Sequence, residues 1–483
     1  MAANVKPFLG AHSSNHVESE AEELRKEHLM FDPMPRDEMN KMVMDSMQHT
    51  TKRYWIFVIG FGLAVAVLLF GAWGYMIATG MGVAGIRRPV FWGVFIVNLV
   101  FWIGISHAGT FVSAILRVFK AEFRRPFTRA AELMTTFGLA AGALYPLVHL
   151  GRVWTFYWMV PYPNARWLWP NFRSPLVWDF LAITTYLLSS TIYLYLPLIP
   201  DLAMARDRSS GVRHFFYRIF SLGWRGTESE WFRLRKAIGI FAFAIIPVMF
   251  SVHTIVSWDF AVSVVAGWQS TIFGPYFIIG AILSGVSAVV TILYILRSTM
   301  KNMDYFIRKE HFDALGKLIL IFSMAWAYFF FNEYLLSWYG GQEVVRSLLT
   351  LHATGPSAWV WYVMLICNVA IPWLFLWSKK VRRTPWLMFI ITIFVNIGMY
   401  AERYTIIPLT LGHQRMPFDW GIYNPTIIEA SISVGTMCLF IFLYLLASKA
   451  IPLVPVWEVQ EGQMAHTLRK VGKTEIPSVA ELD

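Results

Sequence analysis

Cysteine and charged residues are both scarce in this chain of 483 residues. There are 2 cysteines, and 15% of the residues are charged, whereas a soluble domain carries about a quarter. Cys367 and Cys438 both lie inside apolar stretches, with no CxxCH motif and no cluster of cysteines. The sequence therefore predicts no covalently attached haem, no iron–sulfur cluster and no thiolate zinc site in this chain.

What the chain has instead is long apolar runs. Hydrophobic residues make up 57% of it, and the mean hydropathy is +0.51. Stretches of twenty or more apolar residues predict an all-α polytopic membrane protein, because each crosses about 30 Å of hydrocarbon as a helix. Ten spans are expected, at residues 55–79, 90–116, 130–151, 176–198, 237–257, 272–296, 314–337, 358–378, 385–404 and 425–448.

Lysine and arginine collect in the loops on one side of these spans. The loops after spans 2, 4, 6 and 8 hold 22 of them, and the five loops on the other side hold 8. The positive-inside rule then predicts that both termini lie in the cytoplasm. The net charge of +11 follows from this orientation and does not indicate nucleic acid. We expect a cytoplasmic arm at 1–50 without a removable signal peptide, a membrane domain at 51–450 and a cytoplasmic tail at 451–483.

An internal repeat is visible in the sequence. "FWIGISHAG" (101–109) matches "FIIGAILSG" (277–285), and "SPLVW" (174–178) matches "GPSAW" (355–359). Spans 2–5 and 6–9 are therefore predicted to form two four-helix bundles, related as parallel repeats and flanked by spans 1 and 10.

The stretch "LVHLGRVW" (147–154) ends the third span with polar groups. Tyr145, His149 and Arg152 stand at i, i+4 and i+7, so a continuous helix would present them on one face. Gly138 and Gly142 extend that face inward and predict room for a flat ligand. The fourth span then opens with Trp178 and Asp179 on the same side.

Other polar side chains lie at the same depth or deeper. His253 and Asp259 end span 5, and Glu402 and Arg403 end span 9. For Arg403 and Asp259 the alternative interpretation is that they are interfacial anchors. Within the spans, ionisable residues are costly and usually functional, so His107, Glu132 and Glu333 are candidates for a proton path, with buried packing residues as the alternative. Glu402 is predicted to belong to the same path.

The oxidation of a quinol uses such a set of groups without a metal or a thiol. The two hydroxyl protons of the quinol must leave as the electrons depart. A histidine accepts one proton and a nearby carboxylate the next, while an arginine stabilises developing negative charge. The sequence therefore predicts a quinol site with His149 and Asp179 as proton acceptors. Tyr145, Arg152, Trp178, His253, Asp259 and Arg403 are predicted to bind the ring.

At "GWQSTIFGPYFIIGAILSG" (267–285) the chain resembles the NrfD/polysulfide-reductase membrane-subunit family. "SPLVWDFLAITTYLLSSTIYLYLPLIPDLA" (174–203) looks most like the larger quinol-oxidising subunit of bacterial alternative complex III. The resemblance implies menaquinone or ubiquinone as substrate and no haem or iron–sulfur cluster in this chain. It also implies an iron–sulfur partner on the periplasmic face, multihaem cytochrome c subunits, a second NrfD-like membrane subunit and bound lipids. The family's pocket residues map onto His149 and Asp179.

Two other classes of membrane protein remain open. Repeats and buried titratable groups also fit a secondary transporter or proton channel, although the polar groups here gather at one surface and not at the midplane. A di-haem cytochrome b needs paired histidines on facing helices, and His107, His149 and His253 lie at unequal depths. Extending the repeat pairs His149 with Tyr334 and Asp179 with Val360, so a single quinol site in the first bundle is expected.

Overall fold

The computed structural model describes residues 34–160, 175–464, 468–471 and 474–477. Its described part contains ten helices long and apolar enough to cross a membrane, so the predicted all-α polytopic membrane fold is confirmed. Each lies within nine residues of its predicted bounds at either end. The helical spans are Lys52–Thr79, Val94–Val118, Glu122–His149, Val177–Asp207, Glu228–Ala261, Phe273–Thr299, Lys309–Tyr339, Ala358–Phe375, Pro385–Leu409 and Ile427–Ala450.

Six spans are continuous or nearly continuous α-helices, and four contain a π-helical turn. The first group is α7 (Thr128–His149) with its leading 3-10 turn η4 (Glu122–Phe127), α8 (Pro175–Asp207), α10 (Glu228–Ala261), α11 (Phe273–Thr299), α13 (Lys309–Tyr339) and α19 (Ile427–Ala450). The second group is α3 (Lys52–Ala64)–η1 (Val65–Gly71)–α4 (Ala72–Thr79), α5 (Val94–Thr110)–η3 (Phe111–Ile115)–α6 (Leu116–Val118), α15 (Ala358–Leu365)–η6 (Ile366–Ala370)–α16 (Ile371–Phe375) and α18 (Pro385–Tyr404)–η7 (Thr405–Leu409).

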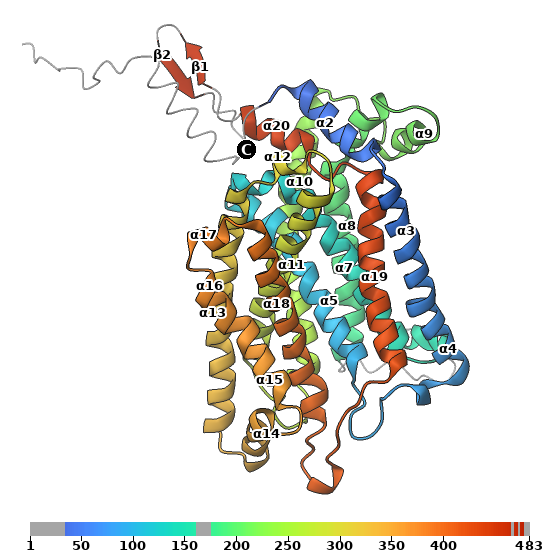
Figure 1. Ribbon diagram of the computed structural model, residues 1–483, viewed down its shortest axis with the longest axis vertical. Coiled ribbons are helices and arrows are strands. Elements are labelled where there is room, and N and C mark those ends of the chain that lie inside the picture. The colour runs from blue at the N-terminus through green and yellow to red at the C-terminus, as the bar shows by residue number, and fades with distance from the viewer. Residues whose placement is uncertain (1–33, 161–174, 465–467, 472–473, 478–483) are drawn as a thin grey trace, which may run out of the picture.

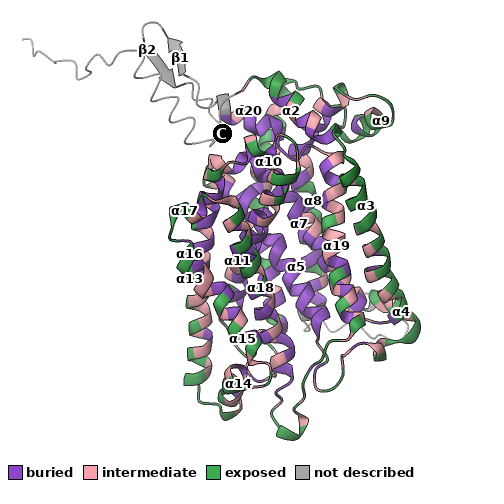
Figure 2. Cartoon of the chain, in the orientation of Figure 1, coloured by how far each residue is buried: buried purple, intermediate pink, exposed green. Residues whose placement is uncertain are grey.

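Helix α5 is the central element of the bundle. Every residue from Val94 to Thr110 is buried, as the purple ribbon in Figure 2 shows. It packs against α7, α10, α11, α18 and α19. At the other extreme, α3 is mostly exposed, which suits a helix whose outer side faces lipid.

Small residues allow α5 to approach its neighbours closely. A Cβ added to Gly109 would lie 2.1 Å from the carbonyl oxygen of Ala131 on α7. A Cβ added to Gly285 on α11 would lie 2.5 Å from the Cβ of Ala108. Both glycines belong to the repeated motif, so that motif specifies close helix packing.

The two sets of four helices each pack among themselves. In the first, α5 contacts α7 and α10, and α8 contacts α7 and α10; in the second, α11 contacts α13 and α18, and α15 contacts α18. The sets meet where α11 lies against α5 and α10. A symmetry relation between them stays a prediction.

Short elements cover the two ends of the bundle (Figure 1). At the end that carries both described termini lie α2 (Arg36–Gln48), α9 (Gly211–Phe220) and α20 (Val456–Met464), and α14 (Glu343–Thr354) lies at the opposite end. The remaining elements are η2 (Met81–Val83), η5 (Val153–Met159), α12 (Met303–Phe306), α17 (Lys379–Arg382), η8 (Pro417–Asp419) and the antiparallel strands β1 (Leu468–Val471) and β2 (Thr474–Pro477).

Parts of the expected arm and tail pack on the membrane domain. Met39 and Val43 of α2 are buried, and so are Trp457 and Val459 of α20. Glu458 of α20 forms ion pairs with Arg117 at 2.8 Å and with Arg124 at 3.1 Å, both on the ends of spans. The division into arm, domain and tail stays a prediction, but the apolar core extends beyond 51–450.

Candidate functional site

The third span ends at His149, on the end of the bundle away from the described termini. Helix α7 stops there because Gly151 takes a left-handed conformation, with φ of +67°, which glycine adopts without strain. Arg152 therefore lies beyond the helix and is exposed. The prediction that one helix face presents Arg152 together with His149 is wrong, since the helix does not extend far enough to carry both.

Tyr145 points away from the fourth span. It is fully buried, and its hydroxyl lies 2.7 Å from Thr436 Oγ1 on α19. The glycine face is also filled: a Cβ at Gly138 or at Gly142 would lie 3.4 Å from atoms of Trp102 on α5. The room for a flat ligand that these glycines predicted is therefore occupied by α5.

Asp179 and Asp259 come together at the start of α8 and the end of α10. These helices pack along their length, and Trp178 meets Trp258 edge to face with ring centroids 6.0 Å apart. Both carboxyl groups are buried, with 5% and 8% of the residue exposed, and they lie within hydrogen-bonding reach of each other. A carboxylate has no donor, so a hydrogen bond between them requires a proton on one.

Several buried polar atoms here lack any other partner. Apart from the contact between the two carboxyl groups, no described residue forms a hydrogen bond with either oxygen of Asp179 or with Asp259 Oδ1. His149 Nδ1 also lacks a hydrogen-bond partner among the described residues. No hydrogen bond joins His149 to Asp179 in the described part of the chain. An unsatisfied buried polar atom costs about 1–3 kcal/mol, so this arrangement favours a ligand or water that supplies the missing bonds.

Two histidines face each other deeper in the bundle. His107 on α5 and His253 on α10 are fully buried, with ring centroids 4.5 Å apart. Both nitrogens of His107 lie near carbonyl oxygens, of Ile103 at 2.7 Å and Met249 at 2.9 Å. A neutral imidazole has one N–H, so only a protonated ring satisfies both. Within the described chain, neither nitrogen of His253 has a partner.

A buried ion pair stands beside these histidines. Arg403 Nη1 lies 2.7 Å from Glu402 Oε2, and Trp326 Nε1 donates to Glu402 Oε1 at 2.9 Å. The guanidinium sits over the ring of Phe277 at 4.6 Å, and His253 contacts the same ring at 5.9 Å. The structure therefore brings Arg403, Glu402, His253 and His107 into one central cluster.

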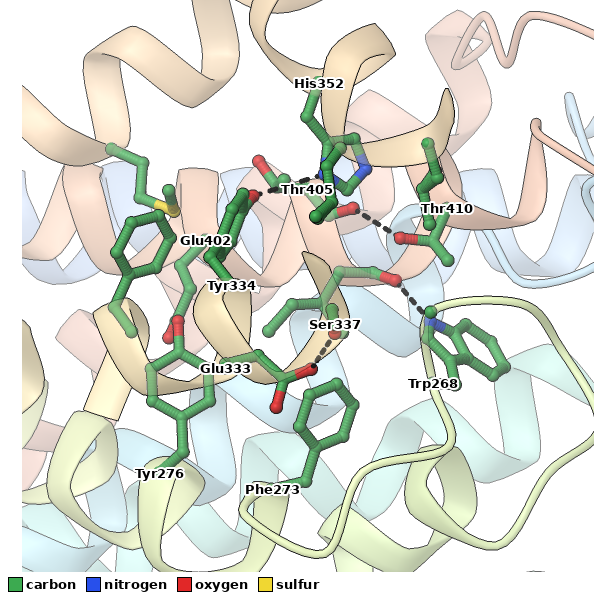
Figure 3. Close-up of a pocket in the computed structure, with 16 residues that line it drawn as sticks. Trp268, Phe273, Tyr276, Glu333, Tyr334, Ser337, His352, Glu402, Thr405 and Thr410 are labelled. Atoms are coloured by element: carbon green, nitrogen blue, oxygen red, sulfur yellow. Dashed lines mark hydrogen bonds between the residues drawn. The ribbon is translucent and has the colours of Figure 1, made fainter. Parts of the chain in front are cut away.

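Glu333 belongs to a different place. It lines a cavity of about 40 Å³ between α11, α13, α14 and α18–η7. We call this space the inner cavity. Figure 3 shows its carboxylate hydrogen-bonded to Ser337, and Ser270 donates to the other oxygen. The polar side chains that line the inner cavity include Glu333, Tyr334, Ser337, His352, Glu402 and Thr405.

His352 is a residue that the sequence prediction missed. The alignment of the repeats sets Tyr334 opposite His149 and places His352 in a loop between spans 7 and 8. That segment is α14, whose buried residues are Val345, Leu348 and His352. Their spacing of three and four residues is that of an amphipathic helix, and this pattern is visible in the sequence.

Glu132 lies near the end of the bundle that carries the described termini. It is buried in the first turns of α7, within electrostatic reach of Arg129, Arg117 and Glu458. The structure therefore places Glu132 apart from the other predicted proton-path residues. In the described ranges, no group of three or more His, Cys, Asp or Glu side chains is placed to hold a metal ion.

Comparison with known proteins gives one family and several relatives. The family model "Polysulphide reductase, NrfD" matches residues 82–412. A putative dimethyl sulfoxide reductase membrane subunit of Halobacterium salinarum is 24% identical, over 84% of this chain and 92% of that protein. A selenate reductase subunit of Mesobacillus selenatarsenatis is also 24% identical, over 80% and 90%. An Hdr-like menaquinol oxidoreductase integral membrane subunit of Archaeoglobus fulgidus is 23% identical, over 88% and 98%.

Proposed function

Because the chain belongs to the NrfD polysulphide reductase family, we propose that it is the quinol-oxidising membrane subunit of a multisubunit respiratory oxidoreductase. The relatives are named as subunits of reductases or of an oxidoreductase, two of them as membrane subunits, and one name specifies menaquinol. The single observation that carries the proposal is the buried pair Asp179 and Asp259, in which both oxygens of Asp179 and Oδ1 of Asp259 lack other partners among the described residues.

The chemistry follows from the charges at this place. A quinol loses two protons and two electrons when it becomes a quinone. A carboxyl pair that shares one proton has one basic oxygen left to accept another, and the neutral imidazole of His149 accepts a second. The hydroxyls of the quinol supply the donors that Asp179 and Asp259 lack. The two electrons pass to a redox partner in the same complex.

We assign the assembly to the alternative complex III type. In this proposal an iron–sulfur subunit binds the periplasmic face, multihaem cytochrome c subunits accept the electrons, and a second NrfD-like membrane subunit lies alongside. The excess of Lys and Arg in the loops on the side of the termini supports a cytoplasmic location for that side. His107, His253 and the Arg403–Glu402 pair then form the inner continuation of the site, along which protons move.

The test is quinol oxidation by the whole complex in native membranes, with menaquinol first and ubiquinol second. We expect Asp179→Asn and His149→Ala each to lower turnover about tenfold or more, a loss of about 1.4 kcal/mol of transition-state stabilisation. The complex should remain assembled.

Asp419→Asn is the matched control. Asp419 lies on the loop that follows span 9, in an ion pair with the exposed Arg88, and takes no part in the carboxyl pair, so turnover should stay near that of the unmodified complex. Near-normal turnover in both site variants would exclude the proposed site.

A further inference from the structure

Two cavities in the second half of the chain share one side chain. The inner cavity reaches Glu333 and Glu402. A second space of about 50 Å³, the outer cavity, lies toward the loops at the end away from the described termini, between Ser357, Tyr404 and Tyr423. His352 lines both. A polar cavity of more than about 15 Å³ has room for a water molecule, so each of the two can hold water.

One ring nitrogen of His352 is hydrogen-bonded and the other is not. Trp361 Nε1 donates to the hydroxyl oxygen of Tyr334 at 2.7 Å, and that hydroxyl lies 3.2 Å from His352 Nδ1 (Figure 3). The tyrosine O–H can donate to Nδ1, and its oxygen can also accept from Nδ1–H, so either ring nitrogen can carry the proton. In the part of the chain that the structure describes, Nε2 is buried and has no partner. In either tautomer this nitrogen is a buried polar atom without a hydrogen bond, which favours a water molecule beside it.

Burial keeps this imidazole neutral at physiological pH. Burial first, and the nearby His413 second, lower the pKa of His352 to about 4. The titratable groups around it are Tyr334 on α13, His413 after η7, Tyr404 and Tyr423 across the outer cavity, and Glu333 and Glu402 across the inner one. In the described chain neither carboxylate forms an ion pair with the ring, because serines bind Glu333 and Arg403 and Trp326 bind Glu402. A neutral imidazole accepts a proton at one nitrogen and releases one from the other.

The inner end of this path is acidic. Glu333 is held by Ser270 and Ser337, and Glu402 by Trp326 and Arg403. Both carboxylates line the inner cavity, so water there contacts two proton acceptors, and Glu402 in turn belongs to the central cluster.

We propose that the two cavities form a proton route, in which water and His352 connect the membrane face away from the termini to Glu333 and Glu402. The route uses neither His149 nor Asp179 nor Asp259. It therefore stands whether or not the chain oxidises quinol.

The first test measures whether water reaches the inner cavity through His352. In the full chain with Cys367→Ala and Cys438→Ala, Thr405→Cys reports on the inner cavity and Ser357→Cys on the outer one. Both should react with a small, water-soluble thiosulfonate added to membrane vesicles. His352→Phe should slow the reaction of Thr405→Cys about tenfold or more, because thiol reactivity follows access, and should leave Ser357→Cys unchanged.

His413→Gln is the control for that substitution. His413 bonds Ser347 and stacks on Trp420 and lines neither cavity, so it should change neither rate. An unreactive Thr405→Cys beside a reactive Ser357→Cys, or a rate that His352→Phe does not alter, would overturn the route.

The second test measures proton transfer in the complex reconstituted in vesicles. His352→Phe should lower the ratio of protons moved to electrons transferred to about half or less, whereas His352→Gln, which keeps one donor and one acceptor, should lower it less. An unchanged ratio in His352→Phe would contradict the proposal. If the unmodified complex oxidises no quinol, the proposed function fails while the cysteine test still decides the route.

Discussion

At the scale of single residues, the structure separates two kinds of buried charge. Glu458 is surrounded by arginines that hold it as a carboxylate, with Arg117 and Arg124 in direct ion pairs. Asp179 and Asp259 have no basic partner among the described residues and face each other. The first arrangement stabilises a fixed charge, and the second is the one that we propose to exchange protons. Burial alone does not distinguish them, but the identity of the neighbours does.

Glu458 should make the fold sensitive to acid. Although burial raises its pKa, the attraction of Arg117, Arg124 and other arginines outweighs this and lowers the pKa to about 2. The folded pKa lies below the unfolded one, so Glu458 contributes stability above about pH 4.5 and loses it as the pH falls toward 2.

Glu458→Gln removes that contribution and leaves the arginines without their partner, so we expect a loss of about 3 kcal/mol or more. The loss should appear as a lower melting temperature of the detergent-solubilised chain at pH 7, and the gap to the unmodified chain should narrow in acid. Asp207→Asn, which removes an exposed pair with Arg206, should leave the melting temperature unchanged. An equal melting temperature for Glu458→Gln and the unmodified chain would refute this assignment.

The sequence predicted the depth of the polar side chains in the membrane better than it predicted which of them contact each other. Asp179, His253 and Arg403 could be placed by depth, since the position of a residue in a helix gives its height in the membrane. Their partners could not, because the rotation of each helix depends on packing. Tyr145 thus turned toward α19 and not toward α8, and Asp259, not His149, became the contact of Asp179.

At the scale of elements, hydropathy and the residues that begin and end helices were enough to find every span in the described chain. A capping box of Thr227 and Glu230 begins α10, and one of Thr426 and Glu429 begins α19. The short helices α14 and α20 were harder to predict, since they have too few residues for a hydropathy signal and only the spacing of Val345, Leu348 and His352 in α14 indicates an amphipathic helix. Their burial comes from tertiary contacts, such as those of Glu458 and His352, which the sequence does not show.

Close helix approach at Gly109 provides a test at this scale. A methyl group there would meet the backbone of Ala131 at 2.1 Å, so Gly109→Ala must push α5 away from α7. We expect a destabilisation of about 1–3 kcal/mol, measured as a lower melting temperature of the purified chain. Gly74→Ala is the control, because a Cβ at Gly74 meets no atom within 4 Å. Equal effects of the two substitutions would show that α5 and α7 do not pack as described.

At the scale of the whole molecule, the ten spans place both described termini and α9 at one end of the bundle and α14 at the other (Figure 1). The positive-inside rule predicts that the first end lies in the cytoplasm. Leu222 and Phe418 are both strongly exposed, with 69% and 82% of the residue accessible, and lie at opposite ends.

In a chain without its native cysteines, a membrane-impermeant maleimide added to intact cells should therefore label Phe418→Cys and not Leu222→Cys. Both should be labelled after the membrane is opened. Labelling of Leu222→Cys in intact cells would reverse the orientation and, with it, the side on which the proposed redox partner binds.

The complete burial of α5 also affects how the chain is made. This helix is the second span to enter the membrane, yet Asn98 donates to Ser433 on the last span at 2.7 Å, and His107 contacts Met249 on α10 at 2.9 Å. Until those spans are synthesised, both polar side chains face lipid or the insertion machinery, where they are costly. In a ribosome-bound chain that ends after α8, Asn98 and His107 therefore lack the partners that they have in the finished protein. His107 gains its contact when α10 enters the membrane, and Asn98 gains its contact only with α19.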